Sequence, residues 1–369
     1  MCEKLSKKEL LRDLCLTFGP SGCEDPVAKK ILENIDGCYD SLIPNRTSGV
    51  IAKICGNGKG GALGTKKLML SCHMDEVGFM IKGINDDGTL KIASMCGPDT
   101  RIMASRRVTV GNKEKQVRGV FGVKPIHLVK RDDMENAISI DEMYIDIGAA
   151  DKEEAEKHVS VGDYATFESD FVSFGQDGRM IKAKAIDDRA GCAIMCDLMK
   201  ELYPIKESIP FDMYFAFTCR EELGISGARS AAFITDPDHA LIFESTAVAD
   251  ICEVPSHTTV AKQGDGPAIS LMDRSTIYDA DFNDLIFKVG REKDIPCQIK
   301  KYVSGGNDAG HIHKSRAGVK CAVMSIPSRY IHTASNVIRE SDFHSTYRLA
   351  LETIKSLMEG ENSVKIQRT

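Results

Sequence analysis

The chain has 369 residues, of which 42% are hydrophobic and 28% are charged, and its formal net charge at pH 7 is -6. This composition is typical of a globular protein, and the length favours two domains over one core. The negative charge argues against nucleic acid and anionic membranes as partners, because both require a basic surface.

The sequence also indicates the compartment. No apolar run approaches the roughly 18 residues of a membrane span, and the N-terminus lacks the apolar segment of a signal peptide. The chain has thirteen cysteines, an odd number, and none form a Cys-x-x-Cys pair. In a long chain this pattern indicates reduced thiols packed as small apolar groups. We therefore expect a soluble cytoplasmic protein, in which the cysteine spacing gives no support for a thiolate metal site.

In chain order, two helices and a strand come first. A capping box, Ser6-x-x-Glu9, precedes helical spacing of apolar residues that ends before Gly19. A second helix is predicted from Asp25-Pro26, with proline at its first position. Residues 68–72 are predicted to form a buried strand that ends in a cluster of polar side chains.

Residues 78–170 have a different pattern. Short alternating apolar pieces occur at 79–84, 90–93, 107–110, 117–123 and 143–147, with Asp86-Asp87-Gly88 and Gly111-Asn112 as turns. This pattern predicts a small β-rich domain inserted into the chain. Such short strands cannot enclose a large core, so we expect the insert to bury apolar surface against another chain.

After residue 170, strands and helices alternate. Strands are predicted at 211–218, 240–243 and 320–325, and helices at 187–202, 224–233, 282–292 and 343–358, with Gly360 closing the last. This alternation predicts an α/β fold with a mostly parallel sheet and helices on both faces, built from residues 1–77 and 171–369. In such sheets, functional groups gather at the carboxyl ends of the strands.

Polar clusters follow the predicted strands. His73 and Asp75 are two residues apart, so in extended chain Asp75 can accept the spare imidazole N–H of His73. Glu221 and Glu222 are adjacent and, if extended, point to opposite sides. Each cluster alone is better explained as a structural or solvated group at a strand end.

Three further groups have similar alternatives. Asp187-Asp188-Arg189 precedes a helix, so Asp187 is either a helix cap or a bridging carboxylate. Glu244 follows a buried strand and needs a partner there, either a basic side chain or a metal. His332 follows Tyr330, and as a loop histidine it needs no special role. Together the clusters supply imidazoles and carboxylates, a set that suits zinc, cobalt or manganese.

Four motifs together resemble metallopeptidase family 42, the TET-type aminopeptidases, some of which are described as glucanases. These motifs are SCHMDEVGFM at 71–80, KAIDDRAG at 184–191, EELGISGA at 221–228 and IPSRYIH at 326–332. Secondary matches are Pro20-Ser21-Gly22, Gly264-Asp265-Gly266-Pro267 and Gly305-Gly306-Asn307-Asp308-Ala309. The resemblance extends over nearly the whole chain, in the family's order.

The resemblance implies two divalent metal ions, most often zinc or cobalt, with manganese as a further option. The implied ligands are His73, Asp187 and Glu244 for one ion, and Asp187, Glu222 and His332 for the other. It implies that Asp75 orients His73 and that Glu221 is the general base. Further implications are peptide substrates with a free N-terminus, a zinc-peptidase-like catalytic domain, and an insert that mediates dimerisation, with dimers commonly forming a tetrahedral dodecamer.

Three departures from the family pattern concern the site. Glu244 stands where many relatives have Asp, and Asn307 stands where Thr is common. Cys219-Arg220 precedes the glutamates where relatives often have Gln. Two other functions remain as alternatives: a glycoside hydrolase that uses Glu221 and Glu222, or a non-catalytic scaffold with a vestigial site. Neither alternative explains two histidines and a bridging aspartate as well as an aminopeptidase does.

Overall fold

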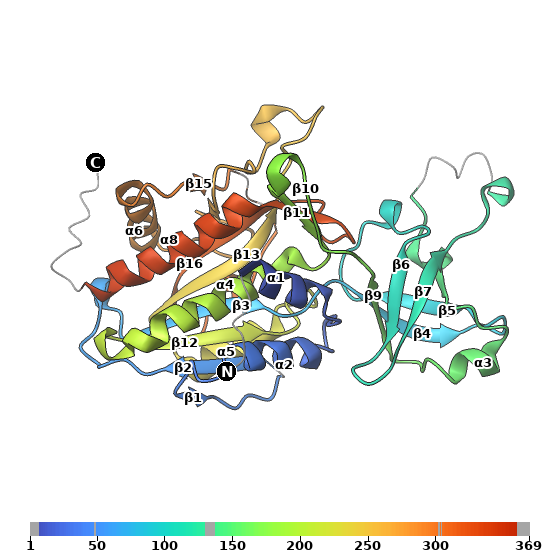
Figure 1. Ribbon diagram of the computed structural model, residues 1–369, viewed down its shortest axis with the longest axis horizontal. Coiled ribbons are helices and arrows are strands. Elements are labelled where there is room, and N and C mark those ends of the chain that lie inside the picture. Colours follow the sequence, from blue (N-terminus) through green and yellow to red (C-terminus); the bar gives the residue numbers. More distant parts are fainter. Residues whose placement is uncertain (1–6, 48, 130–136, 302, 304, 360–369) are drawn as a thin grey trace.

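The computed structural model describes residues 7–47, 49–129, 137–301, 303 and 305–359, so Ser6 of the expected capping box and Gly360 lie outside it. The chain forms an α/β part with a large sheet and a separate β-barrel at one end (Figure 1). Among the described helices, none is long and apolar enough to cross a membrane.

The centre of the large sheet consists of four parallel strands. They are β12 (Asp212–Thr218), β3 (Lys67–His73), β13 (His239–Ala247) and β16 (Lys320–Arg329), in that order. The edges are antiparallel. On one side lie β2 (Val50–Ile54) and β1 (Ser41–Leu42), and on the other β17 (Asn336–Arg339), β11 (Met180–Ala183) and β10 (Val172–Phe174). A short strand, β14 (Ala268–Ile269), pairs with β16 and with β15 (Gln298–Ile299).

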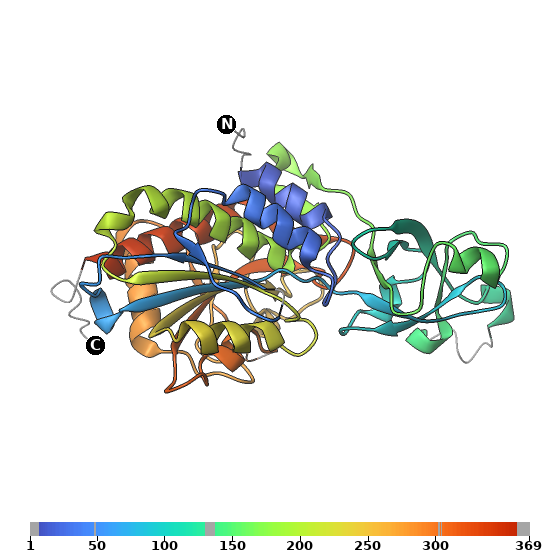
Figure 2. The ribbon, with the colours of Figure 1, turned by 90° about the horizontal axis from the view of Figure 1, so that it is seen from below.

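Helices cover both faces of this sheet, as expected for strands buried on both sides. Leu68 and Leu70 of β3 face a core that includes α1 (Lys7–Leu16), α2 (Asp25–Asn34), α4 (Ile186–Leu202), α6 (Ala280–Glu292) and α8 (Glu340–Met358). Met69 points to the other face, where a smaller core includes α5 (Ser226–Thr235) and α7 (Ala309–Ile312). Figure 2 shows α4 and α5 on opposite sides of the sheet.

The insert is a closed six-stranded antiparallel barrel. Its strands, in order around the barrel, are β4 (Phe79–Ile84), β5 (Leu90–Ser94), β8 (Tyr144–Asp146), β7 (Gln116–Gly122), β6 (Arg107–Gly111) and β9 (Tyr164–Phe167), with the short helix α3 (Lys152–Glu156) between β8 and β9. Closure removes the unpaired strand edges that an open sheet of this size would expose.

The barrel has its own core, centred on three phenylalanines. Phe79 packs edge-to-face on Phe121, with ring centroids 5.0 Å apart, and on Phe167, with centroids 5.7 Å apart. This core is smaller than that of the α/β part, so the expectation that the short strands cannot enclose a large core is not contradicted. They are short, but barrel closure directs one face of every strand inward.

The predicted fold class is confirmed: a mostly parallel central sheet with helices on both faces and an inserted β-rich domain. The antiparallel edge strands and β9 were not anticipated. These strands have between two and five residues, and β11 and β9 each pair with a strand that is distant in sequence. Short segments of this kind carry too little periodicity to be recognised locally.

Candidate metal centre

The candidate site lies where the central parallel strands end. His73 is the last residue of β3, and it pairs in register with Thr218, the last residue of β12. The turn that follows Thr218 carries Glu221 and Glu222 and therefore lies beside His73. Glu244 is inside β13, the neighbour of β3 on the other side. Strand order alone thus brings three of the predicted groups to one edge of the sheet.

The segment between β12 and α5 is a tight turn, not extended chain. Arg220 and Ile225 have φ values of 55° and 58°, in the left-handed region. At Gly227 an added Cβ would lie 2.4 Å from the carbonyl oxygen of Cys219, so only glycine fits there. The extended conformation that would point Glu221 and Glu222 to opposite sides is therefore not adopted, and an oxygen of each lies within 4.8 Å of the other and of a ring nitrogen of His73.

The start of α4 separates the roles of two adjacent aspartates. Asp188 accepts a hydrogen bond from the backbone N–H of Gly191 at 3.0 Å, the contact of a helix cap. Asp187 is thereby not used as the cap, and the peptide bond between the two aspartates is cis. Arg189 does not pair with either of them. Its guanidinium donates to backbone carbonyls of the N-terminal segment at Leu14 and Gly19.

Asp187 faces two imidazoles at once. Its Oδ1 lies 3.4 Å from Nε2 of His73, and its Oδ2 lies 3.4 Å from Nε2 of His332. Each imidazole also faces a second carboxylate. Nε2 of His73 is 3.9 Å from Oε2 of Glu244, and Nε2 of His332 is 3.3 Å from Oε1 of Glu222. The result is two sets of three ligand atoms that share one aspartate.

These atoms fit divalent metal ions. Nε2 of His73, Oδ1 of Asp187 and one oxygen each of Glu222 and Glu244 are buried without a hydrogen-bond partner, which is costly unless another ligand is bound. Ligands about 2.1 Å from a tetrahedral zinc ion lie about 3.4 Å from one another, close to three of the four separations. A third group, His73 with Glu221 and Glu222, is also close enough to hold an ion.

The electrostatics reflect the crowding of carboxylates. Burial opposes protonation of His332, but the hydrogen bond to Asp187 and the charge of Glu222 outweigh it and raise the pKa of His332 to about 9. Burial, reinforced by the charge of Asp187 and opposed by His332, raises the pKa of Glu222 to about 7. Burial likewise raises the pKa of Glu221 and Glu244. Without a metal the site therefore retains protons where a cation would bind.

Asp75 anchors the turn as well as the histidine. Its carboxylate accepts the backbone N–H groups of Glu221 and Glu222 at 3.0 and 3.1 Å, and the hydroxyl of Ser21 at 2.6 Å. Nδ1 of His73 lies 3.0 Å from the backbone carbonyl of Asp75 and 3.5 Å from its carboxylate. The backbone oxygen is thus the nearer acceptor for the imidazole, and not the carboxylate expected from the spacing.

Two buried acidic residues near the site belong to motifs named above, but the sequence assigned no function to either of them. Glu76 contacts Nζ of Lys184 at 2.5 Å and the hydroxyl of Thr166, in barrel strand β9, at 2.7 Å. It thereby ties the end of β3 to the segment before α4 and to the barrel. No local sequence signal indicates such partners, because they are separated from Glu76 by about a hundred residues.

Asp308 is the second of these acids. It accepts hydrogen bonds from Thr218, the last residue of β12, at 2.7 Å and from Ser71, near the end of β3, at 3.2 Å. Burial raises its pKa to about 6. The neighbouring histidines, His311 and His313, belong to none of the three possible ligand groups among the described residues.

Comparison with known proteins agrees with this geometry. Residues 52–349 match the model of the M42 glutamyl aminopeptidase family. A candidate aminopeptidase from Acetivibrio thermocellus is 35% identical over 346 residues, which cover 94% of this chain and 98% of that protein.

Two solved structures show the same fold. A TET aminopeptidase from the marine sediment archaeon Thaumarchaeota archaeon SCGC AB-539-E09 is 32% identical with a TM-score of 0.90, over 95% of this chain and 96% of that one. The TET1 peptidase of Pyrococcus horikoshii, described as assembling into a tetrahedron or a large octahedral shell, is 28% identical with a TM-score of 0.82, over 94% and 98% of the two chains. This chain therefore belongs to the M42 glutamyl aminopeptidase family and is an aminopeptidase of the metallopeptidase class.

Proposed function

We propose that the chain removes single residues from the free N-terminus of peptides at a dinuclear metal site. One observation carries the proposal: Asp187 presents one carboxylate oxygen to His73 and the other to His332. A carboxylate shared in this way is suited to bridge two cations, with Glu244 completing one ligand set and Glu222 the other. The nitrogen and oxygen donors favour zinc or cobalt, with manganese as a further option.

The metal ions, Glu221 and Asp75 have separate roles in the proposed hydrolysis. When bound, the two metal ions lower the pKa of a water molecule toward neutrality and stabilise negative charge on the substrate carbonyl. Glu221, which the two ligand sets leave free, accepts the proton of that water and returns it to the leaving amine. Its raised pKa, caused first by burial, suits a group that must hold a proton between these steps. Asp75 positions Glu221 because its carboxylate accepts the backbone N–H of Glu221.

The surplus of negative charge explains why the free terminus is recognised. Four carboxylates, those of Asp187, Glu221, Glu222 and Glu244, converge on the centre, and neighbouring Asp75 is also buried. Two divalent ions offset only part of this charge. A substrate α-ammonium, with a reference pKa near 8, is attracted by the remainder, and its neutral form can ligate a metal.

Timed digests test this function. The metal-reconstituted chain is incubated with one short peptide in free and N-acetylated forms, and the products are followed by mass spectrometry. We expect stepwise loss of N-terminal residues from the free peptide and negligible cleavage of the acetylated one. Equal rates on both forms, or early internal fragments, would refute the proposal. Hydrolysis of a β-glucan without peptide cleavage would favour a glycoside hydrolase, and inactivity with both metals bound would favour a scaffold.

We further propose that the insert, residues 78–170, mediates dimerisation in a cytoplasmic assembly. Ile126 and Leu128, in a short 3-10 helix of the insert, are 73% and 55% exposed, and the Pyrococcus horikoshii relative is described as assembling into a tetrahedron or a large octahedral shell. All cysteines in the described part of the chain are free thiols, as a reducing compartment would keep them. Light scattering after size exclusion should give the mass of a dimer or a multiple of it. A monomer at micromolar concentration in the presence of metal would contradict this.

A further inference from the structure

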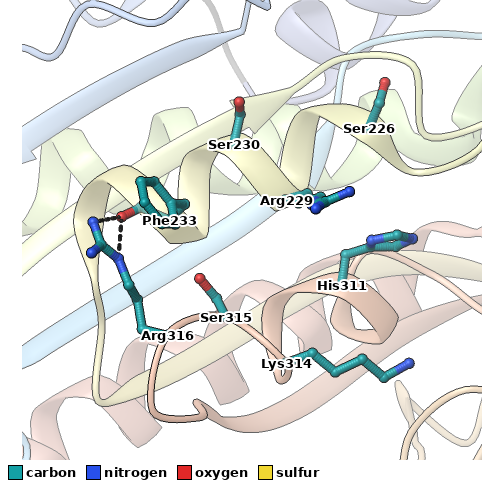
Figure 3. A pocket seen from close by; sticks show the side chains of 8 residues that line it. All are labelled: Ser226, Arg229, Ser230, Phe233, His311, Lys314, Ser315 and Arg316. Carbon is teal, nitrogen blue, oxygen red and sulfur yellow. Dashed lines mark hydrogen bonds between the residues drawn. The ribbon is translucent and has the colours of Figure 1, made fainter.

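A cavity of about 560 Å³ lies between α5 and the segment that begins with α7 (Figure 3). None of its lining residues belongs to a possible ligand group among the described residues. It is lined by basic and hydroxyl side chains and one phenylalanine: Ser226, Arg229, Ser230, Phe233, His311, Lys314, Ser315 and Arg316.

The lining is positively charged in a chain whose net charge is negative. Figure 3 shows Arg229 extending from α5 toward the segment that carries His311 and Lys314. Across the described residues, neither Arg229 nor Lys314 takes part in an ion pair. Burial lowers the pKa of His311, and the charges of Lys314 and Arg229 lower it further. Like charges without an ion-pair partner on one lining would be stabilised by a bound anion.

The other end of the cavity is held in a fixed arrangement. Nε and Nη2 of Arg316 donate to the backbone carbonyl of Phe233 at 3.0 and 2.8 Å, and the guanidinium lies 3.6 Å over the Phe233 ring. Arg316 has a φ of 53°, in the left-handed region, where a non-glycine residue is strained. Its side chain is thus pre-organised, and Nη1 is not used in these contacts.

We propose that this cavity is a binding site for an oxyanion with at least two negative charges, and first of all for a phosphate group. Guanidinium and ammonium groups form strong charge-assisted hydrogen bonds to such anions, and Arg229 and Lys314 are available to do so. The hydroxyl of Ser315, which points toward α5 in Figure 3, adds a neutral donor. The cavity's volume accommodates a small phosphorylated molecule as well as free phosphate.

Occupancy would link two elements that border the metal centre. α5 begins four residues after Glu222, and α7 begins directly after Asp308. An anion held by Arg229 on one side and by His311 and Lys314 on the other would fix the separation of these elements. The site nevertheless stands apart from the proposed peptidase chemistry and does not depend on it.

Calorimetric titration of inorganic phosphate into the metal-loaded chain tests the site, at constant ionic strength with chloride as the balancing anion. The test variant is Arg229→Gln with Lys314→Gln. The matched control is Lys30→Gln with Arg291→Gln, which removes the same charge from exposed positions elsewhere. Arg316 stays unchanged because it also caps α5. We expect the test variant to bind phosphate at least about tenfold more weakly than the wild type, and the control to match the wild type.

Phosphate also ligates metal ions, so a crystal grown with selenate serves to locate the anion. An anomalous peak between Arg229 and Lys314 supports the proposal, and a peak at the metal centre alone overturns it. Equal phosphate affinity in all three proteins also overturns it. A changed assembly mass in the test variant, with unchanged phosphate affinity, would show instead that the cavity receives an acidic surface of a second copy.

Discussion

The contrast between Glu221→Gln and Glu222→Gln is the sharpest test of the site. The two residues are adjacent and both lie near His73, and one possible ligand group contains both. Only Glu222 lies within 4.0 Å of an imidazole nitrogen, at 3.3 Å from His332, and only Glu222 of the two has a buried oxygen without a partner. We therefore expect Glu222 to hold metal and Glu221 to hold a proton.

The magnitudes follow from these positions. Glutamine preserves the shape of Glu221 but is not basic, so kcat should fall by about 10²–10⁴-fold, the usual contribution of a general base. This corresponds to about 2.7–5.5 kcal/mol in the activation free energy. KM and metal content should stay near the wild-type values. In Glu222→Gln a ligand is lost, so the affinity for one ion should fall by more than the roughly 10–100-fold typical of losing an outer hydrogen-bond partner.

Two measurements on each variant decide the matter: metal content after dialysis at a defined free-metal concentration, and steady-state kinetics on an aminoacyl chromogenic substrate at saturating metal. Excess metal should restore activity to Glu222→Gln in part, but not to Glu221→Gln. The reasoning is refuted if Glu221→Gln loses an ion as readily as Glu222→Gln does. In that case Glu221 is a ligand in the group with His73, and the base must be sought elsewhere.

Three further outcomes are expected. Asp187→Asn should weaken both ions together, because each of its oxygens faces a different ligand set; metal analysis that finds one ion still at full occupancy would contradict the bridge. Metal uptake by the metal-free chain should release protons below about pH 9, because the raised pKa of His332 keeps it protonated there. Affinity should accordingly weaken as the pH falls, and a titration without proton release would count against His332 as a ligand. Asp308→Asn keeps an acceptor for Thr218 but removes a negative charge that raises the pKa of Glu221. The acid limb of kcat/KM should therefore move to lower pH, and an unmoved profile would exclude this coupling.

Much of the α/β part could be predicted from the sequence because its signals are local. The parallel strands are apolar runs, and the long helices have a continuous apolar stripe, so both types of element are recognisable within a short window. The polar clusters at the ends of these runs follow from the same pattern. Once strands such as β3 and β12 are parallel neighbours, His73 and the glutamates must lie at one edge of the sheet.

Local signals did not determine side-chain direction. The adjacent glutamates were expected on opposite sides of extended chain, but the left-handed residues Arg220 and Ile225 curl the segment so that both approach His73. The choice between cap and bridge at Asp187-Asp188 was likewise open in the sequence. It depends on the backbone at the start of α4, where Asp188 takes the N–H of Gly191.

Contacts between distant segments were decided only by the tertiary structure. Closure of the barrel requires β9 to pair with β4, some eighty residues earlier in the chain. This closure gives the insert a hydrophobic core that could not be predicted from its short strands. Two further contacts also join segments that are distant in sequence. Asp308 contacts Ser71 and Thr218, and Arg229 lines one cavity together with His311 and Lys314. Sequence alone determined the long helices, the parallel strands and the chemistry at the ends of those strands. Which side chains face one another depended on chain reversals and on packing between distant segments. Both are set by the free energy of the whole fold, so no periodic pattern within a single segment predicts them.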